Sequence, residues 1–243
     1  MWDIYDKLLA EIPKGPTVDC VHQGPTWTLV KAGDLTGIAV TINEAHLSIP
    51  TYDHLEGRSL KEVAALCKDW DFMTAGVGTA ALNAWLSHSD FAADGIGDAV
   101  RTGNTFDDYA QFAKGKKVAV IGHFRMLERS LLDISQVSIL ERLPEPGDYP
   151  DSACEYILPE QDLVFITGSA FTNKTLPRLL ELSKNARTVI VGPSTPLSDI
   201  LFDYGVDELS GLVPGDIPAT QFESIGCDEI SLSKIGTRIR IKK

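Results

Sequence analysis

The spacing of apolar and polar positions changes along the chain, and the change divides the chain into two parts. In the first part, residues 17–42 contain three short β-rich runs. The runs are broken at Gly24-Pro25 and at Gly33-Asp34, and both dipeptides are turn signals. This pattern predicts a small antiparallel meander.

Two helical patterns follow the meander. Residues 59–70 place apolar side chains on one helical face, and Ser59 and Glu62 have the spacing of a capping box. Residues 78–87 form a second, more apolar helical pattern. The glycine-bearing stretch at 76–80 is interpreted as a turn and helix start, because no clear strand precedes it as a phosphate-binding loop requires. Strands followed by separate helices predict an α+β domain.

In the second part, short apolar runs alternate with segments of helical spacing. The predicted strands are residues 117–122, 137–142, 162–168 and 188–192, and the predicted helices are residues 124–133, 151–157, 175–184 and 197–203. Further strand and helix patterns follow at 206–213 and 218–225. Such alternation predicts βαβ units and a parallel sheet with helices on both faces.

The predicted fold class is therefore α/β, with two domains. A small α+β domain is expected at residues 1–100, and a Rossmann-like parallel-sheet domain at residues 101–243. Residues 88–116 are polar and glycine-rich, with a short helical pattern near 107–112, and are interpreted as the connection between the two domains.

The tail of the chain has strand spacing. Ile235, Ile239 and Ile241 have the parity opposite to that of Arg238, Arg240 and Lys242. This alternation predicts an amphipathic edge strand whose charges point outward and discourage pairing with other chains. A strand that contacts an anion is the alternative.

Charge and composition narrow the classes of partner. The 243 residues carry a formal net charge of −12, which disfavours nucleic acid and anionic membranes as partners. No apolar run is long enough to span a bilayer, and the first residues lack the features of a signal peptide, so a cytoplasmic protein is predicted. The four cysteines lie far apart and are predicted to be reduced, mostly buried thiols. The oligomeric state stays open, and a homo-oligomer is compatible with the sequence.

Polar residues gather where the predicted strands end, which is the edge at which open α/β sheets bind ligands. The loops after these strands carry His123, Glu141, Thr167, Ser169, Thr172, Asn173, Thr175, Ser194 and Thr195. Such a set predicts a site for a small ligand with anionic or many-oxygen character. For any one residue, helix capping is the alternative: Asn173 or Thr175 could cap the helix near Leu176, and Ser194 or Thr195 the next one.

His123 and Glu141 are the candidate catalytic residues. An imidazole titrates near neutral pH and can relay a proton. Glu141 lies 19 positions after Gly122, close to the spacing at which an acidic residue binds ribose in dinucleotide folds. However, His123 stands where a pyrophosphate needs bare backbone, so NAD is not expected. A mononucleoside-type ligand such as S-adenosylmethionine stays open, and no metal-ligand spacing occurs among the histidines and cysteines.

Several segments resemble, in order, the signature segments of the putative heavy-metal chelation family. They are VIGHF at 120–124, ERLPEPGDYP at 141–150, TGSAFTNKTL at 167–176 and GPSTPL at 192–197, and GTAALNA at 78–84 resembles the helix motif of the preceding small domain. The resemblance covers essentially the whole chain and implies an enolase N-terminal-like domain followed by a Rossmann-like domain. The chain departs from the family pattern at position 125, where the family often has a proline and this chain has Arg125. This arginine adds a cation near the expected site.

The resemblance also implies which residues line the site between the two domains. Besides His123 and Glu141, the implied ligand-binding residues are Asn83, Thr167, Gly168, Ser169, Asn173, Thr175, Gly192, Pro193, Ser194, Thr195 and Pro196. Asn83 would reach the site from the first domain.

Three functions fit these observations. The first is an enzyme that makes or processes an oxygen-rich chelator or related metabolite by condensation or hydrolysis, with His123 as general acid or base and Glu141 orienting the ligand. The second is a protein that holds a metal or metal chelate without turnover, although soft metals prefer thiolates and imidazoles and only His123 lies among the motifs. The third is an S-adenosylmethionine-dependent methyltransferase. The candidate cofactors are a heavy metal or a metal chelate, and the expected partner is a small anionic or metal-chelating metabolite.

Overall fold

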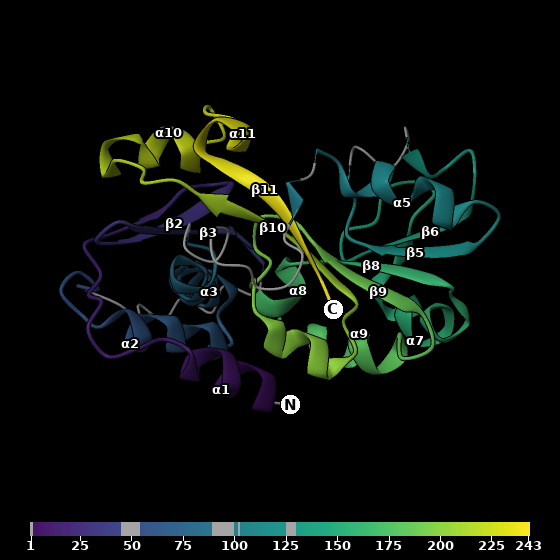
Figure 1. Ribbon diagram of the computed structural model, residues 1–243, viewed down its shortest axis with the longest axis horizontal. Coiled ribbons are helices and arrows are strands. Elements are labelled where there is room, and N and C mark those ends of the chain that lie inside the picture. The colour runs from purple at the N-terminus through teal and green to yellow at the C-terminus, as the bar shows by residue number, and fades with distance from the viewer. Residues whose placement is uncertain (1, 45–53, 89–99, 102, 125–129) are drawn as a thin grey trace.

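The chain folds into two sheets that lie beside each other (Figure 1). The computed structural model describes residues 2–44, 54–88, 100–101, 103–124 and 130–243. Within them, one sheet has three antiparallel strands in the order β1-β2-β3, and the other has eight strands in the order β4-β11-β10-β9-β8-β5-β6-β7. The second sheet is mostly parallel. The α/β fold class predicted from the sequence is therefore confirmed.

The elements have the following bounds. The strands are β1 (Cys20–Gln23), β2 (Trp27–Ala32), β3 (Leu35–Val40), β4 (Val100–Arg101), β5 (Lys117–Ile121), β6 (Gln136–Glu141), β7 (Tyr149–Pro150), β8 (Leu163–Thr167), β9 (Arg187–Val191), β10 (Glu208–Pro214) and β11 (Gly236–Lys242). The α-helices are α1 (Asp3–Ala10), α2 (Leu60–Ala64), α3 (Phe72–Leu86), α5 (Thr105–Ala113), α7 (Cys154–Ile157), α8 (Ser169–Thr172), α9 (Leu176–Leu182), α10 (Phe222–Gly226) and α11 (Leu232–Ile235). The 3-10 helices are η1 (Ala65–Lys68), η2 (Asp151–Ala153), η3 (Leu158–Glu160), η4 (Asp199–Tyr204) and η5 (Ala219–Gln221).

Helix α3 is the central helix of the first part, and it is longer than the sequence predicted. It begins at Phe72, where the side chain of Asp71 caps it by accepting a hydrogen bond from the Thr74 N–H. The stretch 76–80 therefore lies inside the helix, and its interpretation as a turn was wrong. Gly78 is needed there for close packing, because a Cβ would stand 1.9 Å from the Cys67 nitrogen. The capping box of Ser59 and Glu62 at the start of α2 is confirmed.

Both faces of the small sheet are covered. Helix α3 packs on one face, and α10 and α11 lie over the other (Figure 1). On this second face, Leu29 and Ile38 of the sheet share an apolar cluster with Phe222 and Ile225 of α10. Residues near the C-terminal end of the chain thus complete the hydrophobic core of the small N-terminal sheet. The domain boundary at residues 100 and 101 stays a prediction.

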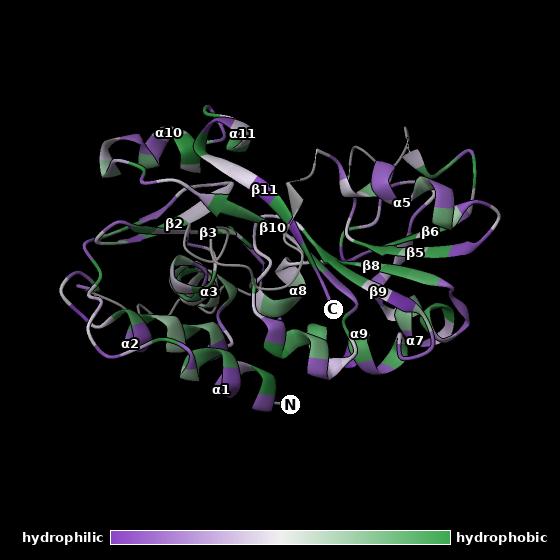
Figure 2. Cartoon of the chain, viewed as in Figure 1, coloured by the Kyte–Doolittle hydropathy of each residue, from purple (hydrophilic) through white to green (hydrophobic). Residues whose placement is uncertain are grey.

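The central strands of the larger sheet are apolar on both faces, and Figure 2 shows them as green arrows between helices. Phe165 of β8 faces α5, where it packs against Phe106. Its neighbour Ile166 belongs to the core on the opposite face together with Phe171 of α8. Helices therefore cover both faces, as predicted.

The tail strand β11 differs from its prediction. Ile239 and Ile241 are buried as expected, but β11 pairs with β10 on one side and with β4 on the other, so it lies one strand in from the edge. The Arg240 guanidinium does not point freely outward, because Nη1 lies 3.1 Å from an Asp108 carboxylate oxygen that α5 brings over this face.

Other predictions have mixed outcomes. The segment predicted as a helix at 197–203 is the 3-10 helix η4, which the Ser198 side chain caps. Half of the predicted helix at 124–133, including Arg125, lies outside the described residues, as do residues 89–99 and 102 of the connection; the short helical pattern near 107–112 is part of α5. All four cysteines are free; Cys67 and Cys154 are buried, whereas Cys227 is exposed.

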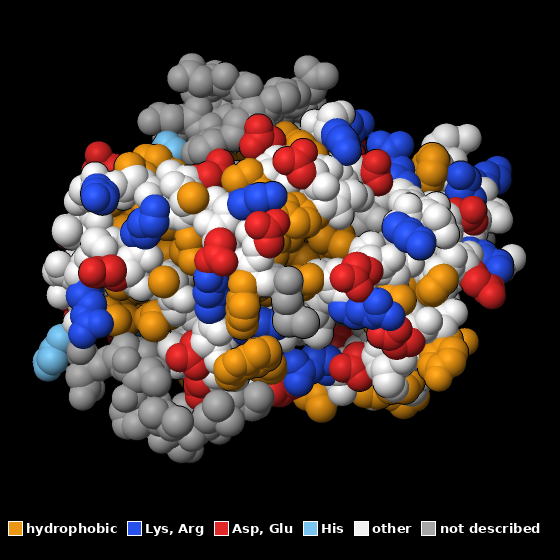
Figure 3. Space-filling view, turned by 90° about the horizontal axis from the view of Figure 1, so that it is seen from below, with side chains coloured by type: hydrophobic (Ala, Val, Ile, Leu, Met, Phe, Trp, Pro, Cys, Tyr) orange, Lys and Arg blue, Asp and Glu red, His pale blue; other side chains and the backbone are white. Residues whose placement is uncertain are grey.

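The surface mixes charges of both signs. On the face that carries α1, α2, α7 and α9, acidic and basic side chains are interspersed (Figure 3), and several form ion pairs, such as that of Lys7 with Asp3. Across the parts of the chain that the structure describes, every helix falls short of the length and apolar character needed to cross a bilayer.

Candidate functional site

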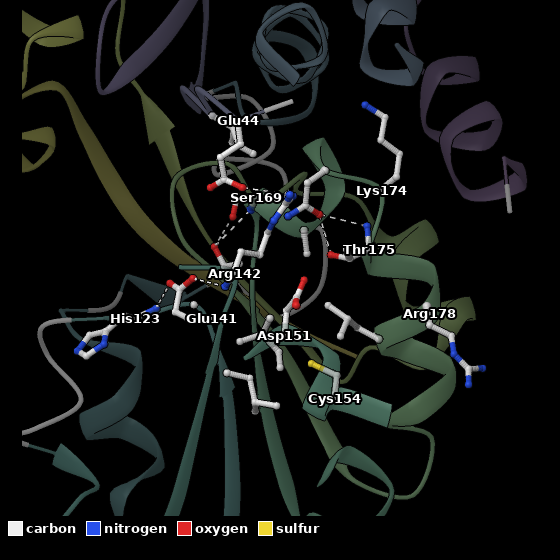
Figure 4. Close-up of a pocket in the computed structure, with 18 of the residues that line it drawn as sticks. Glu44, His123, Glu141, Arg142, Asp151, Cys154, Ser169, Lys174, Thr175 and Arg178 are labelled. Carbon is white, nitrogen blue, oxygen red and sulfur yellow. Dashed lines mark hydrogen bonds and ion pairs between the residues drawn. The ribbon is translucent and has the colours of Figure 1, made fainter. Parts of the chain in front are cut away.

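A cavity of about 690 Å³ opens at the carboxyl edge of the larger sheet. The ends of β5, β6 and β8 form its floor, and α7 and α9 contribute to its sides. The last residue of β3 in the small sheet and the four residues after it (40–44) border the cavity on the other side, where Figure 4 shows Glu44. Residues from both sheets therefore share one concave surface, which is the usual form of a small-molecule site.

Six of the residues predicted from the sequence line this cavity. They are His123, Glu141, Thr167, Ser169, Asn173 and Thr175. Parallel strands deliver them, because β5, β6 and β8 run side by side and end at the same edge. The Thr167 and Ser169 hydroxyls bond to each other at 3.0 Å. Asn173 Oδ1 accepts hydrogen bonds from the Thr175 N–H at 3.1 Å and from its hydroxyl at 2.7 Å.

The other predicted residues lie outside the cavity wall. Asn83 is buried in α3, where its Nδ2 donates to the Ile38 carbonyl oxygen at 3.0 Å. Gly168 packs against the Thr195 backbone. The remaining residues form the loop after β9: Gly192 and Pro193 line a smaller cavity of about 130 Å³ beside α5, and Ser194, Thr195 and Pro196 are buried.

Helix capping does not explain the polar residues of these loops. No side chain caps α9 at Thr175, and Asn173 instead closes a local turn. The Ser194 hydroxyl accepts a hydrogen bond from the Val40 N–H at 2.8 Å, and Thr195 Oγ1 donates to the Ser210 carbonyl oxygen at 3.2 Å. Ser194 therefore joins the loop after β9 to the end of β3, at the margin of the cavity.

Glu141 fixes the geometry of two strand ends. Its Oε1 accepts a hydrogen bond from the His123 N–H at 2.7 Å, and its Oε2 accepts one from the Arg142 N–H at 2.9 Å. The carboxylate therefore ties the turn after β5 to the end of β6. Each oxygen keeps a second lone pair, so Glu141 can still accept a hydrogen bond from a ligand hydroxyl.

His123 lies at the margin of the cavity, and its ring points away from Glu141, Arg142 and Ser169 (Figure 4). Its Nδ1 donates to a carboxylate oxygen of Asp148 at 3.2 Å. This hydrogen bond, with smaller contributions from the charges of Asp148, Glu145 and Glu141, raises the pKa of His123 above its usual value. The imidazole is thereby held in a fixed orientation and favoured in its protonated form.

Arg142 and Glu44 were not predicted from the sequence. Nη2 of Arg142 lies 3.0 Å from Oε2 of Glu44, and Figure 4 shows this pair beside Ser169. The guanidinium carbon also lies over the ring of Phe72, 5.1 Å from its centroid. The sequence did contain a signal for Arg142, because it directly follows Glu141 at the end of a predicted strand, where ligands of such sheets bind.

Lys174 was also missed, although it stands between two predicted residues. It is 8 % exposed, and its ammonium donates to the Thr172 carbonyl oxygen at 2.8 Å. It lies over the Phe72 ring, 5.4 Å from the centroid. Burial lowers the pKa of this amine to about 8. Lysines are seldom buried unless they are paired, so the sequence alone gave no reason to expect a buried ammonium at this position.

The donor groups of the cavity do not fit a directly coordinated heavy metal. No group of three or more His, Cys, Asp or Glu side chains is arranged to hold a metal ion among the residues that the structure describes. Burial raises the pKa of the Cys154 thiol to about 12, so this sulfur stays protonated at neutral pH, whereas metals bind thiolates. His123 is engaged by Asp148.

Fold and site together define an α/β protein with a cavity between an antiparallel sheet and the carboxyl edge of a mostly parallel one. Residues 5–86 match the model of the family DUF4213, and residues 104–221 match that of DUF364; both carry the description "Putative heavy-metal chelation". The chain belongs to this heavy-metal chelation family, as its motifs indicated.

Solved and curated relatives agree with this assignment. A crystal structure of a DUF364-family protein of unknown function from Desulfitobacterium hafniense DCB-2 is 38% identical, with a TM-score of 0.91 over 100% of this chain and 99% of that one. A DUF364-family protein of unknown function from Pyrococcus horikoshii has the same fold at 22% identity, with a TM-score of 0.80 over 99% of this chain and 98% of that one. An uncharacterised protein of Methanocaldococcus jannaschii is 28% identical over 72% of this chain and 68% of its own length.

Proposed function

We propose that the protein binds a small, oxygen-rich organic acid of the metal-chelating kind in the 690 Å³ cavity, and acts on it by condensation or hydrolysis. The observation that supports this best is the composition of the wall. Hydroxyl, amide, guanidinium and carboxylate groups line the cavity, whereas no group of three or more His, Cys, Asp or Glu side chains among the described residues is arranged to hold a metal. A metal would therefore reach this site together with an organic chelator.

The wall also offers groups for proton transfer. Glu141 lines the same cavity as Thr167 and Ser169 and can accept a hydrogen bond from a substrate hydroxyl. His123 lies at the margin, and its orientation by Asp148 is the arrangement that a general acid or base requires. A substrate that extends to this margin would contact the imidazole. The methyltransferase hypothesis and the cytoplasmic location stay predictions without further support.

Thermal unfolding in the presence of candidate ligands tests the binding step. The panel consists of citrate, malate, inorganic phosphate, S-adenosylmethionine, and zinc and nickel salts with and without citrate. A ligand at 100 times its dissociation constant stabilises the fold by about 2.7 kcal/mol, which is readily detected. We expect organic acids to stabilise the protein without metal. Stabilisation by metal ions alone, with no response to any organic acid, contradicts the proposal.

Turnover is tested separately on whichever acid binds. The acid is incubated with the protein, and NMR spectra are compared over time with a His123→Ala sample. New signals that appear with the wild type and are lost in the variant support an enzyme that uses His123. An acid that binds and stays unchanged, both alone and with an amine or alcohol added as the second reactant of a condensation, indicates a protein that holds the chelate without turnover.

A further inference from the structure

Arg142 differs from the other cationic side chains of the cavity in what holds it. The Arg178 guanidinium is gripped by both carboxylate oxygens of Glu155, at 2.9 and 2.6 Å. The Lys174 ammonium is buried and donates to a backbone carbonyl oxygen. Arg142 instead pairs with Glu44 through one contact of 3.0 Å, and both side chains are about one-third exposed, at 33% and 35%.

We propose that Arg142 anchors an anionic group of the ligand, and that Glu44 is an internal counter-ion which this group displaces. The inference rests on the proposed function, because it names the residue that selects the ligand in the same cavity. It also specifies the ligand class: a carboxylate or phosphate at Arg142, with hydroxyl groups toward Thr167 and Ser169.

The geometry holds the Arg142 guanidinium in place before a ligand arrives. The cation lies over the ring of Phe72, which is only 8% exposed and is the first residue of α3. The Lys174 ammonium lies over the same ring, so Phe72 is fixed by contacts from two loops of the larger sheet. A cation that is already oriented loses little conformational freedom on binding, and its planar fork matches a carboxylate.

Glu44 is suited to be displaced rather than retained. It belongs to the segment after β3, not to the sheet edge that carries Arg142, and its carboxylate is partly in water. An exposed ion pair of this kind contributes little to stability, so exchanging one carboxylate for another costs little. In the free protein, Glu44 also offsets the charge of Arg142 within the cavity.

The surrounding charges limit what Arg142 can accept. Glu141, Asp151 and Glu155 also line the cavity, and each adds negative charge near the ligand. Their charges oppose every anionic group of a ligand other than the one at Arg142, so a polycarboxylate such as citrate should depend strongly on its contact with Arg142. One anionic group at Arg142, followed by neutral oxygen atoms, matches the hydroxyl-bearing wall formed by Thr167 and Ser169.

Isothermal titration of the full-length protein with citrate, in low salt and without metal, tests this assignment. We expect Arg142→Gln to weaken citrate binding at least 10-fold, because a charge-assisted hydrogen-bonded contact is lost. We expect Glu44→Gln to strengthen it roughly 3-fold or more, because the competing carboxylate is gone. Arg58→Gln is the matched control: it removes the same charge from an exposed residue outside the cavity, and should change the affinity less than 2-fold.

The outcomes separate the inference from the function on which it rests. If the wild type binds citrate and Arg142→Gln behaves as Arg58→Gln does, the anchor is elsewhere and the inference fails alone. The same holds if Glu44→Gln weakens binding. If neither citrate, malate nor phosphate binds the wild type, the proposed function itself fails. Should Arg142→Gln not fold, Arg142→Lys keeps the charge without the fork, and citrate affinity equal to that of the wild type overturns the contact of the planar fork with a ligand carboxylate.

Discussion

The loops after β8 and β9 look alike in sequence but serve different purposes in the fold. Both follow a buried strand, and both bring hydroxyl groups to the same edge of the sheet. After β8, Thr167 and Ser169 line the cavity. After β9, Ser194 and Thr195 are 3 % and 0 % exposed and bond to backbone groups. Polar residues at a strand end therefore predict hydrogen bonds at that edge of the sheet. Which hydroxyl groups stay accessible to a ligand depends on whether a backbone group nearby already bonds to them.

The two loops also touch, and the second supports the first. Gly168 is the N-cap residue of α8, and its Cα faces the backbone of Ser194 and Thr195 so closely that no side chain fits. The loop after β9 in turn is held to the small sheet by the bond from Val40. The cavity wall after β8 is therefore positioned by residues that do not contact the cavity.

The largest effect is expected from a methyl group placed at this contact. In Gly168→Ala, the new Cβ would lie 2.5 Å from the Thr195 nitrogen and 2.7 Å from the Ser194 carbonyl carbon. Because both are backbone atoms, one loop must shift, and we expect the free energy of unfolding to fall by about 3 kcal/mol. Urea denaturation measures this loss.

Gly103→Ala provides the control for that experiment. A Cβ at Gly103 meets no atom within 4 Å, so its stability should stay within about 0.5 kcal/mol of the wild type. Equal losses for the two alanine variants would show that the contact between the loops does not constrain the fold.

Lys174 gives the first loop a buried charge, and its titration should make stability depend on pH. Burial lowers its pKa from the usual 10.5 to about 8. Between these values the unfolded chain binds the proton more than the folded protein does, so the free energy of unfolding rises with pH. For a shift of this size, the gain is about 3 kcal/mol over the whole window.

Comparison with Lys174→Met isolates this contribution from other groups that titrate. Urea denaturation of both proteins at pH 7, 8.5 and 10 should show the wild type gaining stability relative to the variant as pH rises. Cys67, which faces the lysine, has its pKa raised to about 12 and stays protonated over this range. Parallel pH profiles would indicate that the ammonium is solvated.

Ser194 tests the supporting loop at a single hydrogen bond. In Ser194→Ala, the partly buried Val40 N–H loses its acceptor, and an unsatisfied group of this kind costs about 1 to 2 kcal/mol. Urea denaturation should detect the loss. Stability unchanged from that of the wild type would mean that another acceptor or a water molecule replaces the hydroxyl, so that the loop after β9 is not held through Ser194.

The sequence predicted the strands well because their information is local. The apolar run at 162–168 became β8, and helices cover both faces of the sheet as the alternation of patterns implied. Helix α3 was shortened in the prediction because Gly76 and Gly78 disfavour a helix. Gly78 is required by the close approach of η1, which only the tertiary structure shows, whereas a Cβ at Gly76 would make only ordinary contacts.

The candidate site was predictable in position but not in detail. Strand ends located its edge, and six of the residues chosen there line the cavity. The role of Ser194 depends on Val40, which lies 154 positions away in the chain. Arg142 and Lys174 meet at Phe72, which comes from the other part of the chain. Contacts between residues so far apart in the chain leave no local sequence pattern, so neither cation was predicted to belong to the site.

The smallest effect on stability, and the sharpest contrast with Ser194, is expected at Ser169. Its hydroxyl bonds to Thr167 at 3.0 Å in a half-buried position that water can reach, so Ser169→Ala should lower the free energy of unfolding by less than about 1 kcal/mol. The same variant should weaken citrate binding roughly 3- to 10-fold, because one neutral hydrogen bond to the ligand is lost.

Ser194→Ala should do the reverse, lowering stability while leaving citrate affinity within about 2-fold. Urea denaturation and calorimetric titration on both variants give the four values. If Ser169→Ala proves the less stable variant, or if citrate affinity falls more in Ser194→Ala, then the loop after β9 provides the binding wall and the loop after β8 its support. The crossed result is expected because the Ser194 hydroxyl is committed to Val40, whereas the Ser169 hydroxyl can exchange its Thr167 partner for a ligand oxygen.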